Sequence, residues 1–548
     1  MDFVREVEKL LGAHPDVWED KDRGELVGEV IRRREALVAE SGALATWTPV
    51  ESTGRRPKDT YIVDRPEVHD EVDWASPYCI PMDEETFDMV VGDALAVLKG
   101  SRRLYATHRA LGADPAYALP VRTVTDRALT ALFTDNMFRQ PPAGWSRSAF
   151  AGQAFTLLVL PYHKLDPARY AGRLREDPET GQTSDIAVVM DFARRMGVVY
   201  GSAYLGSVKK LMFTVMNHLL PDQGVLPLHC GASKGREGDV ALFLGLSGTG
   251  KTSLSSDPAR RLIGDDEHGW SQAGIFNFEA GCYAKLVNLS EEKEPDIYQA
   301  VMHHAPPKQH GTIVENAMVY PDGRIDFCDD RLTPNSRASY PLTFIHNADP
   351  VGTGGHPQTI LFLTADANGV LPPVARLSPP QAMLWFLMGY TSKLAGTETG
   401  VVEPVSTFSR FFGAPFMPRL PGMYAGMLGE FLERYGARVY LVNTGWSGGP
   451  YGQGNRMDIR LTRRMVGAAL SGELDQVEMQ EDRLFHLWVP THCPGVPDEV
   501  LWSRNTWKDG AAYQARAERL AQEFARHFER EFAAGDIDPQ VAAQCPGR

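Results

Sequence analysis

The segment DVALFLGLSGTGKT (239–252) decides how the rest of the chain is interpreted. Its first half is a short apolar run that predicts a buried strand, and its second half follows the pattern G-x-x-x-x-G-K-[ST]. Glycines in such a loop let successive backbone N–H groups turn toward phosphate oxygens, and the lysine adds positive charge for the β- and γ-phosphates. The residues predicted to form this nucleotide site are Gly245, Leu246, Ser247, Gly248, Thr249, Gly250, Lys251, Thr252 and Ser253.

An acidic segment, LIGDDEHGW (262–270), follows the loop closely. Carboxylates at the end of an apolar strand beside a phosphate loop are typical metal ligands, and the motif assigns the Thr252 hydroxyl to Mg²⁺. Only nine residues separate Thr252 from Leu262, whereas a parallel crossover needs a dozen or more. We therefore do not expect the acidic strand to be a parallel neighbour of the loop strand, which argues against a Ras-like or RecA-like topology.

The composition of the 548 residues excludes several classes of protein. With 43% hydrophobic and 23% charged residues, the chain is neither disordered, fibrous nor a disulfide-rich miniprotein. The formal charge, 56 basic minus 70 acidic residues, is −14, which argues against nucleic acid and anionic membranes as partners. No CxxC pair, signal sequence or membrane-length apolar run is visible, so we expect a cytoplasmic protein with reduced thiols.

Glycine and proline punctuate the chain near residues 220–226, where we place a domain boundary. The predicted domains are an N-terminal α/β domain over 1–223 and a C-terminal nucleotide-binding domain over 224–548. The clearest predicted elements are strands or buried segments at 154–163 and 184–192, a buried helix over 378–396, a strand at 437–446 and an amphipathic helix over 511–532.

Taken together, the motifs resemble those of ATP-dependent phosphoenolpyruvate carboxykinases. Besides the loop and the acidic segment, the resemblance is carried by GRRPKDTY (54–61), YLGSVKKLMF (204–213), LHC (228–230), GIFNFEAGCYAK (274–285), NSRASYP (335–341), FLTADANGVLPPVARL (362–377), KLAGTE (393–398) and YLVNTGW (440–446). The loop resembles the ATP class, because the GTP class usually carries a cysteine within it.

The resemblance implies a mixed α/β fold with the active site in the cleft between a substrate domain and the P-loop domain. It implies the reversible, gluconeogenic conversion of oxaloacetate and ATP to phosphoenolpyruvate, CO₂ and ADP, through a metal-stabilised enolate and in-line transfer of the γ-phosphoryl group. The implied cofactors are one Mn²⁺ per site and the Mg²⁺ of ATP. The implied partners are these small molecules alone, and the sequence leaves open a monomer or a homo-oligomer.

The resemblance also assigns the metal ligands. Lys210, His229 and Asp266 would bind Mn²⁺, and Asp265 would orient the Mg²⁺ held by Thr252. A lysine binds a metal only as the neutral amine, which the charge of a neighbouring lysine favours if both side chains point the same way. Without the motif context, the Lys209–Lys210 pair is equally typical of a solvated surface, and His229 of a protein core.

Further residues take roles from the same resemblance. Arg55 would bind the substrate carboxylate, and Tyr204 would contact the substrate or CO₂. Arg337 would lie between the substrate and the γ-phosphate and offset negative charge there. The residues assigned to the nucleotide outside the loop are His229, Lys285, Glu294, Arg337, Arg456, Met457 and Thr462. A lid is expected over 393–400, with Gly396 and Gly400 as hinges.

Two other functions stay open on the sequence alone. One is a kinase or hydrolase that shares only the phosphate loop, and the other is an ATP-binding regulatory protein without turnover. The match also has departures: the segment 447–456 is longer than usual, which affects the placement of Arg456 and Thr462, and Gln272, Arg56 and Thr60 replace commoner residues.

Overall fold

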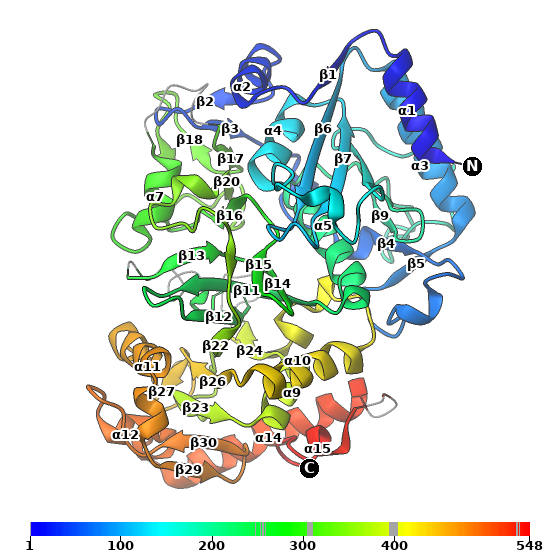
Figure 1. Cartoon of the computed structure of the whole chain (residues 1–548). Coiled ribbons are helices and arrows are strands. Elements are labelled where there is room, and N and C mark those ends of the chain that lie inside the picture. Colours follow the sequence, from blue (N-terminus) through cyan, green and yellow to red (C-terminus); the bar gives the residue numbers. More distant parts are fainter. Residues whose placement is uncertain are drawn as a thin grey trace. The chain divides into compact units, whose positions relative to one another are not determined.

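The computed structural model describes residues 2–246, 248–251, 254, 257, 259–303, 311–393, 404–532, 535 and 537–548 (Figure 1). The chain forms two compact units. Unit 1 consists of Met1–Gly224, Phe276–Gly352 and Pro415–Pro418; unit 2 consists of Val225–Ile275, Thr353–Ala414 and Arg419–Arg548. The first boundary between the units, after Gly224, lies beside the predicted domain boundary. A division of the chain at one position is wrong, however, because Phe276–Gly352 and Pro415–Pro418 also belong to unit 1.

The larger sheet of unit 1 has eight strands in the order β1-β6-β7-β8-β10-β9-β4-β5. It is mixed: β7 and β8 are parallel, whereas β6 and β7 are antiparallel. The strands are β1 (Val17–Glu19), β4 (Thr60–Val63), β5 (Ile80–Met82), β6 (Leu104–Leu111), β7 (Leu119–Thr125), β8 (Phe155–Leu160), β9 (Ala187–Asp191) and β10 (Met196–Tyr200). Strands β8 and β9 occupy the two apolar segments predicted at 154–163 and 184–192.

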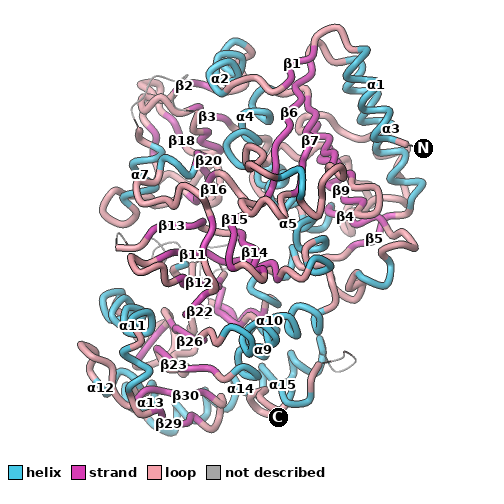
Figure 2. Tube along the Cα trace, in the orientation of Figure 1, coloured by secondary structure: helices cyan, strands magenta, loops and turns pink. Residues whose placement is uncertain are grey.

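Two helices cover one face of this sheet. Helices α1 (Phe3–Ala13) and α3 (Glu84–Gly100) lie side by side (Figure 2). Their apolar residues, Val7 and Val90 among them, form one core with the strand residues. Asp2 and Asp83 cap the two helices by accepting from backbone N–H groups of the first turn, which fixes where each helix begins.

A second, five-stranded sheet explains why residues 276–352 belong to unit 1. Its order is β16-β20-β17-β3-β2, so strands from the later segment pair with strands near the N-terminus. The strands are β2 (Leu37–Val38), β3 (Leu44–Thr46), β16 (Gly281–Lys285), β17 (Ile313–Glu315) and β20 (Arg337–Pro341). The other elements of unit 1 are α2 (Arg23–Arg32), α4 (Ala128–Met137), α5 (Gly206–Leu219), α7 (Pro295–Val301), β18 (Met318–Val319) and β19 (Ile325–Asp326).

Unit 2 is built on an eleven-stranded sheet. Its order is β21-β15-β14-β11-β12-β22-β26-β23-β30-β29, and β13 also pairs with β11. The strands are β11 (Leu226–Lys234), β12 (Val240–Gly245), β13 (Arg261–Gly264), β14 (Glu267–Ser271), β15 (Gly274–Asn277), β21 (Thr353–Gly354), β22 (Pro357–Thr364), β23 (Val374–Leu377), β26 (Arg438–Asn443), β29 (Met479–Asp482) and β30 (Leu487–Pro490). Strand β12 is parallel to β22, and β22 is parallel to β26.

The position of the acidic strand confirms the spacing argument. Strand β13 runs antiparallel to β11 rather than parallel beside β12. A short connection is therefore enough, because no crossover over the sheet is required. The carboxylates of Asp265 and Asp266 therefore follow a strand that is antiparallel to β11.

The described part of unit 2 also contains helices and two antiparallel strand pairs. They are α9 (Pro379–Met388), α10 (Pro421–Tyr435), α11 (Ile459–Ser471), α12 (Asp498–Leu501), α13 (Ser503–Thr506), α14 (Gly510–Phe532) and α15 (Pro539–Ala542), with hairpins β24 (Tyr390–Lys393)–β25 (Val405–Phe408) and β27 (Trp446–Ser447)–β28 (Asn455–Arg456). Helix α14 and strand β26 confirm two predicted elements. Among the described helices, none is long and apolar enough to cross a membrane.

The predicted helix over 378–396 is too long. Helix α9 ends at Met388, because Gly389 adopts a left-handed conformation with φ +53° and donates its N–H to the Trp385 carbonyl. An L-residue side chain is strained there, which makes glycine a strong stop signal. The chain then continues as β24, whose first three residues are buried in a strand rather than in the predicted helix.

Candidate active site

The phosphate loop leaves the end of β12 in unit 2. Gly250 has a φ of +95°, a conformation that glycine adopts without strain. A Cβ at Gly245 would lie 2.5 Å from the Thr249 hydroxyl and 2.9 Å from the Leu363 Cβ, so this position has no room for a side chain. Thr249 is buried and donates its hydroxyl to the Leu246 carbonyl at 2.8 Å. Ser247, Thr252 and Ser253 lie outside the described residues.

Two of the predicted metal ligands lie together with the loop lysine. His229 Nε2 is 3.0 Å from Asp266 Oδ1. The Lys251 ammonium lies 2.7 Å from the same carboxylate oxygen and 3.4 Å from His229 Nε2. Asp265 precedes Asp266 in the turn between β13 and β14, where it is half-buried. The structure thus brings an imidazole, a carboxylate and an ammonium to one point.

The hydrogen bond on the other side of the ring assigns the tautomer of His229. Its Nδ1 lies 2.6 Å from the Phe412 carbonyl oxygen, which only accepts, so Nδ1 carries the proton. In the neutral ring, Nε2 then presents a lone pair beside the Asp266 carboxylate. Two electron-pair donors of this kind fit a divalent transition metal, and the carbonyl orients the ring as such sites require.

The carbonyl that orients His229 belongs to an unusual turn. Phe411 and Phe412 have φ angles of +61° and +56°, which bulky residues rarely adopt. Gly413 follows, and a Cβ there would approach the His229 Cβ to 3.1 Å. These three residues were not singled out from the sequence, because neither a phenylalanine pair nor a lone glycine signals a ligand support.

Arg456, which the sequence assigns to the nucleotide, is hydrogen-bonded to the backbone of the phosphate loop. Its guanidinium donates to the Gly248 carbonyl at 3.0 Å and to the Thr444 carbonyl at 3.2 Å. It also lies 5.7 Å from the Trp446 ring centre, and burial lowers its pKa. The long segment 447–456 forms the β27–β28 hairpin, in which Arg456 pairs with Trp446.

The remaining adenosine candidates are more scattered. Met457 follows Arg456 and donates its backbone N–H to the Gly445 carbonyl at 2.7 Å. Thr462 is only 1% exposed in the first turn of α11, with its hydroxyl 3.4 Å from the Asp458 carbonyl. Glu294 precedes α7 in unit 1, where burial raises its pKa. Glu294 is therefore not grouped with the loop within unit 2.

Unit 1 gathers candidates for binding the organic acid. The Arg55 guanidinium and the Lys210 ammonium lie 4.6 and 4.7 Å from the centre of the Phe416 ring. Both residues line one small cavity, together with Tyr78. Two cations on one aromatic ring give this part of unit 1 a positive charge, and guanidinium and ammonium groups are suited to binding a carboxylate.

Lys209 has a different role from its neighbour. It is 3% exposed and forms an ion pair of 2.5 Å with Glu279. Its charge is balanced by this carboxylate, so the idea that Lys209 favours a neutral Lys210 loses its basis. The alternative of a solvated lysine pair is also wrong, because Lys209 is buried.

A second group in unit 1 surrounds Tyr283. The Tyr204 ring lies beside it in a tilted arrangement with 5.8 Å between ring centres, and the Arg337 guanidinium lies 5.8 Å from the Tyr283 ring. The Tyr283 hydroxyl donates to Glu315, whose other oxygen accepts from the Leu205 N–H at 3.0 Å. Burial raises the pKa of Glu315 to about 7. Tyr283 and Glu315 were missed from the sequence, since no spacing links them.

Arg337 is held in place by Asn335, which lies two residues before it in the chain. Its Nε and Nη2 donate to Asn335 Oδ1 at 3.0 and 2.8 Å, and Asn335 donates to the Thr53 carbonyl. Lys285 pairs with Arg337 across β16 and β20, and burial, with the charge of Arg337, lowers the pKa of Lys285. This cationic edge suits an anionic substrate.

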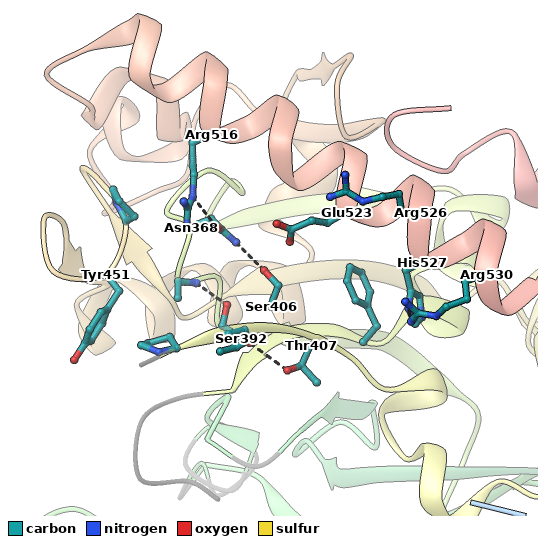
Figure 3. A pocket seen from close by; sticks show the side chains of 15 residues that line it. Asn368, Ser392, Ser406, Thr407, Tyr451, Arg516, Glu523, Arg526, His527 and Arg530 are labelled. Carbon is teal, nitrogen blue, oxygen red and sulfur yellow. Dashed lines mark hydrogen bonds between the residues drawn. The ribbon is translucent and has the colours of Figure 1, made fainter. Parts of the chain in front are cut away.

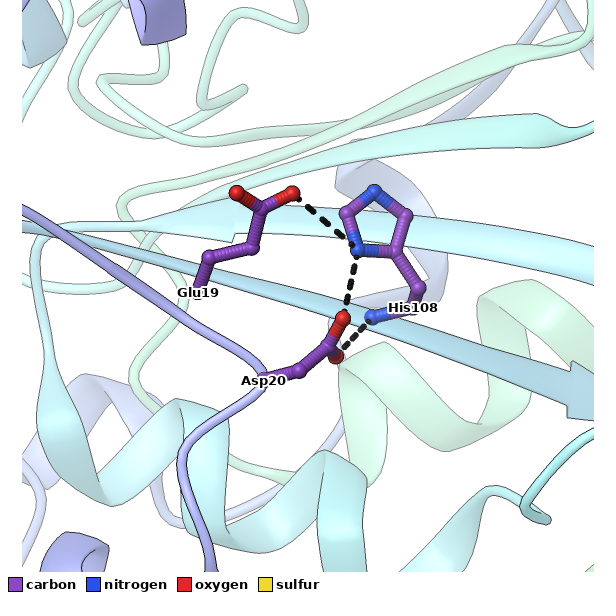
Figure 4. Close-up of side chains that lie close together, drawn as sticks. All are labelled: Glu19, Asp20 and His108. Carbon is purple, nitrogen blue, oxygen red and sulfur yellow. Dashed lines mark hydrogen bonds and ion pairs between the residues drawn. The ribbon is translucent and has the colours of Figure 1, made fainter.

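Glu19, Asp20 and His108 form another group with the side-chain types of a metal site (Figure 4). His108 Nδ1 lies 2.9 Å from Asp20 and 3.6 Å from Glu19. Asp20 also accepts from Arg109, and all three members are at least 41% exposed. Ion pairing explains this cluster, which is typical of a solvated surface.

The fold and these groups are those of one class of protein: an α/β phosphoryl-transfer enzyme with a glycine-rich phosphate loop. A sequence model of the phosphoenolpyruvate carboxykinase family that uses ATP matches residues 16–499. The chain is 50% identical over 515 residues to "Phosphoenolpyruvate carboxykinase (ATP) 1" of Moorella thermoacetica, covering 93% of this chain and 94% of the relative. It is 48% identical over 533 residues to the ATP enzyme of Geobacillus kaustophilus, covering 97% and 96%.

The chain therefore belongs to the ATP-dependent phosphoenolpyruvate carboxykinase family. It converts oxaloacetate and ATP to phosphoenolpyruvate, CO₂ and ADP, a lyase reaction of gluconeogenesis. The match extends far beyond the phosphate loop, which excludes a kinase or hydrolase that shares only this motif. It confirms the resemblance inferred from the motifs.

Proposed function

We propose that His229 and Asp266 of unit 2 and Lys210 of unit 1 are the ligands of Mn²⁺ in this reaction. The supporting observation is the hydrogen bond from His229 Nδ1 to the Phe412 carbonyl, which leaves Nε2 as an electron-pair donor beside Asp266. A divalent ion bound there supplies a Lewis acid for the negative charge that loss of CO₂ leaves on the substrate oxygen. The location of the active site between the two units stays a prediction.

Lys251 is proposed to exchange partners when ATP binds. Its ammonium pairs with Asp266, and the β- and γ-phosphates offer it a more highly charged partner. Transfer of the ammonium to the phosphates releases the Asp266 oxygen for the metal. The Mg²⁺ of the nucleotide is assigned to Thr252, with Asp265 orienting its shell.

The cations of unit 1 are proposed to bind and polarise the organic acid. Arg55 binds the carboxylate that remains in phosphoenolpyruvate. Because its guanidinium already packs on the Phe416 ring, the Arg55 side chain loses less conformational entropy when the substrate binds. Tyr204 contacts the substrate through its phenol. Arg337, fixed by Asn335, offsets the charge of the phosphoryl group during its in-line transfer, and Lys285 adds charge nearby.

The finer assignments follow from these roles. Arg456 and Met457 are proposed to contact adenosine, because the guanidinium is joined to the backbone of the phosphate loop. Thr462 and Glu294 are proposed for the same contact on the resemblance alone. Unit 1 is proposed to bind the organic acid and unit 2 the nucleotide. The lid at 393–400, of which 394–400 lie outside the described residues, and the cytoplasmic location stay predictions.

The metal assignment is tested by His229→Ala. We expect the variant to lose Mn²⁺-dependent formation of phosphoenolpyruvate and to retain binding of MgATP, because the loop is intact. The matched control is His492→Ala, since His492 is 58% exposed and pairs with Asp498 on the surface of unit 2. Unchanged Mn²⁺ dependence in His229→Ala would refute the ligand role.

A further inference from the structure

Unit 2 contains a second cavity, with a volume of about 670 Å³ (Figure 3). Its described lining comes from helix α14, the β24–β25 hairpin and the segments around Asn368 and Tyr451. The described residues of the phosphate loop, His229, Asp266 and Arg456 are not among them. The volume is in the range of small-molecule sites, so the cavity is large enough for a metabolite.

The cavity is positively charged although the chain is acidic. Helix α14 contributes Arg516, Arg526 and Arg530, and Glu523 is the one acid among the described lining residues. Arg530 also pairs with Glu531 at 2.9 Å, so three guanidinium groups and two carboxylates give a local charge of +1, in a chain of net charge −14. A local reversal of sign of this kind attracts anions, and arginine binds carboxylate and phosphate in a bidentate manner.

His527 supplies a buried donor to the same cavity. It is 7% exposed, and its ring stacks on Phe408 with 4.3 Å between ring centres. Its Nδ1 lies 2.9 Å from Nη2 of Arg530, which can only donate, so Nδ1 accepts and Nε2 carries the proton. Nε2 is buried and has no hydrogen-bond partner among the described residues.

An unpaired buried donor is costly, and a ligand that accepts from it removes the cost. Burial lowers the pKa of His527 to about 4, so the ring is neutral at pH 7 and Nε2–H remains an uncharged donor. The ligand atom that fits is therefore an oxygen with a lone pair, such as a carboxylate or phosphate oxygen.

The least exposed of the three arginines, Arg516, is already fixed. Arg516 Nε donates to Asn368 Oδ1 at 2.8 Å. The Asn368 amide in turn donates to the Tyr390 hydroxyl at 2.9 Å and to Ser406 at 3.3 Å. A side chain held in this way loses little conformational entropy on binding, so the site is preorganised for an anion.

We propose that this cavity binds a small metabolite with two or more carboxylate or phosphate groups, at a site separate from the catalytic residues. Arg516, Arg526 and Arg530 bind the anionic groups, and the Nε2–H of His527 donates to one of their oxygens. The stacked rings of Phe408 and His527 form the apolar wall against which the ligand packs.

The test is calorimetric titration of the full-length protein, saturated with MgATP to occupy the phosphate loop. Citrate and pyrophosphate are the two probes, and the tighter one identifies the preferred group. The test variants are R526Q/R530Q and His527→Phe, which keeps the stack on Phe408 and lacks the donor. The matched control is Arg519→Gln, an exposed arginine of α14 outside the cavity lining.

We expect at least one probe to bind with 1:1 stoichiometry, at least tenfold more weakly to R526Q/R530Q and several-fold more weakly to His527→Phe. Arg519→Gln should bind like the wild type, and all variants should unfold at a similar temperature and keep basal turnover. The proposal is overturned if neither probe binds the wild type at millimolar concentration, or if R526Q/R530Q binds as tightly as Arg519→Gln.

Discussion

Replacing Glu315 by glutamine tests the buried carboxylate that accepts from Tyr283 and Leu205. Glu315 is 1% exposed on β17, and its two oxygens accept from the Tyr283 hydroxyl and the Leu205 N–H. Burial is the largest cause of its raised pKa, and these two hydrogen bonds and the charge of Arg337 act against it. Glutamine keeps the size and one of the two accepting oxygens, as a protonated carboxyl group does, but carries no charge.

The magnitude and sign follow from proton linkage. The pKa is about 7 in the folded protein against a reference of 4.5, so between these values the folded state binds more protons than the unfolded chain. The free energy of unfolding therefore falls as the pH rises from about 4.5 to about 7. At 1.36 kcal/mol for each pH unit, the loss amounts to about 3 kcal/mol.

The assay is urea unfolding at pH values from 5 to 8. Near pH 5, Glu315→Gln and the wild type should have similar stability, whereas at pH 8 the variant should be the more stable by about 3 kcal/mol. The control is Glu67→Gln, which changes an exposed carboxylate of unit 1. A stability difference between Glu315→Gln and wild type that does not change with pH would show that the buried carboxylate is ionised throughout.

Two further substitutions address unit 2. Gly413→Ala places a methyl group 3.1 Å from the His229 Cβ, so we expect the Mn²⁺ concentration for half-activity to rise about 10- to 100-fold with MgATP affinity unchanged. Gly426→Ala, where a Cβ meets nothing within 4 Å, is the control, and equal behaviour of the two would contradict the prediction. Arg456→Ala should raise the KM for ATP by about tenfold or more, because charged hydrogen bonds are lost, and leave the KM for oxaloacetate unchanged. A parallel rise in both constants would argue against a nucleotide role.

The local features of the fold are predictable from the sequence because they depend on neighbouring residues. The phosphate loop needs its glycines wherever it occurs, and the short connection between Thr252 and Leu262 excluded a parallel neighbour for the acidic strand. The C-terminal helix α14 has a plain amphipathic pattern. Each of these conclusions follows from spacing within one segment.

What the sequence did not reveal depends on contacts between distant segments. The return of 276–352 to unit 1 rests on the pairing of β17 with β3, which no local pattern announces. The support of His229 by the Phe412 carbonyl joins residues 183 positions apart. Glu315 was missed for the same reason, since its burial and its bond to Tyr283 are properties of the folded sheet.

The different surroundings of the two neighbouring lysines of α5 also could not be predicted from the sequence. Lys209 and Lys210 are adjacent in sequence, yet one pairs with buried Glu279 and the other lies on Phe416. Neighbouring residues on a helix point about 100° apart, so two adjacent lysines of α5 face different surroundings. A pair of like residues in a motif therefore need not share a role.

The formation of phosphoenolpyruvate by the purified protein is the most direct test of the account. The assay contains Mn²⁺, oxaloacetate and either ATP or GTP as the phosphoryl donor. We predict turnover with ATP that depends on oxaloacetate and is faster than with GTP. Faster turnover with GTP would contradict the nucleotide assignment, and no phosphoenolpyruvate with either donor would contradict the central claim.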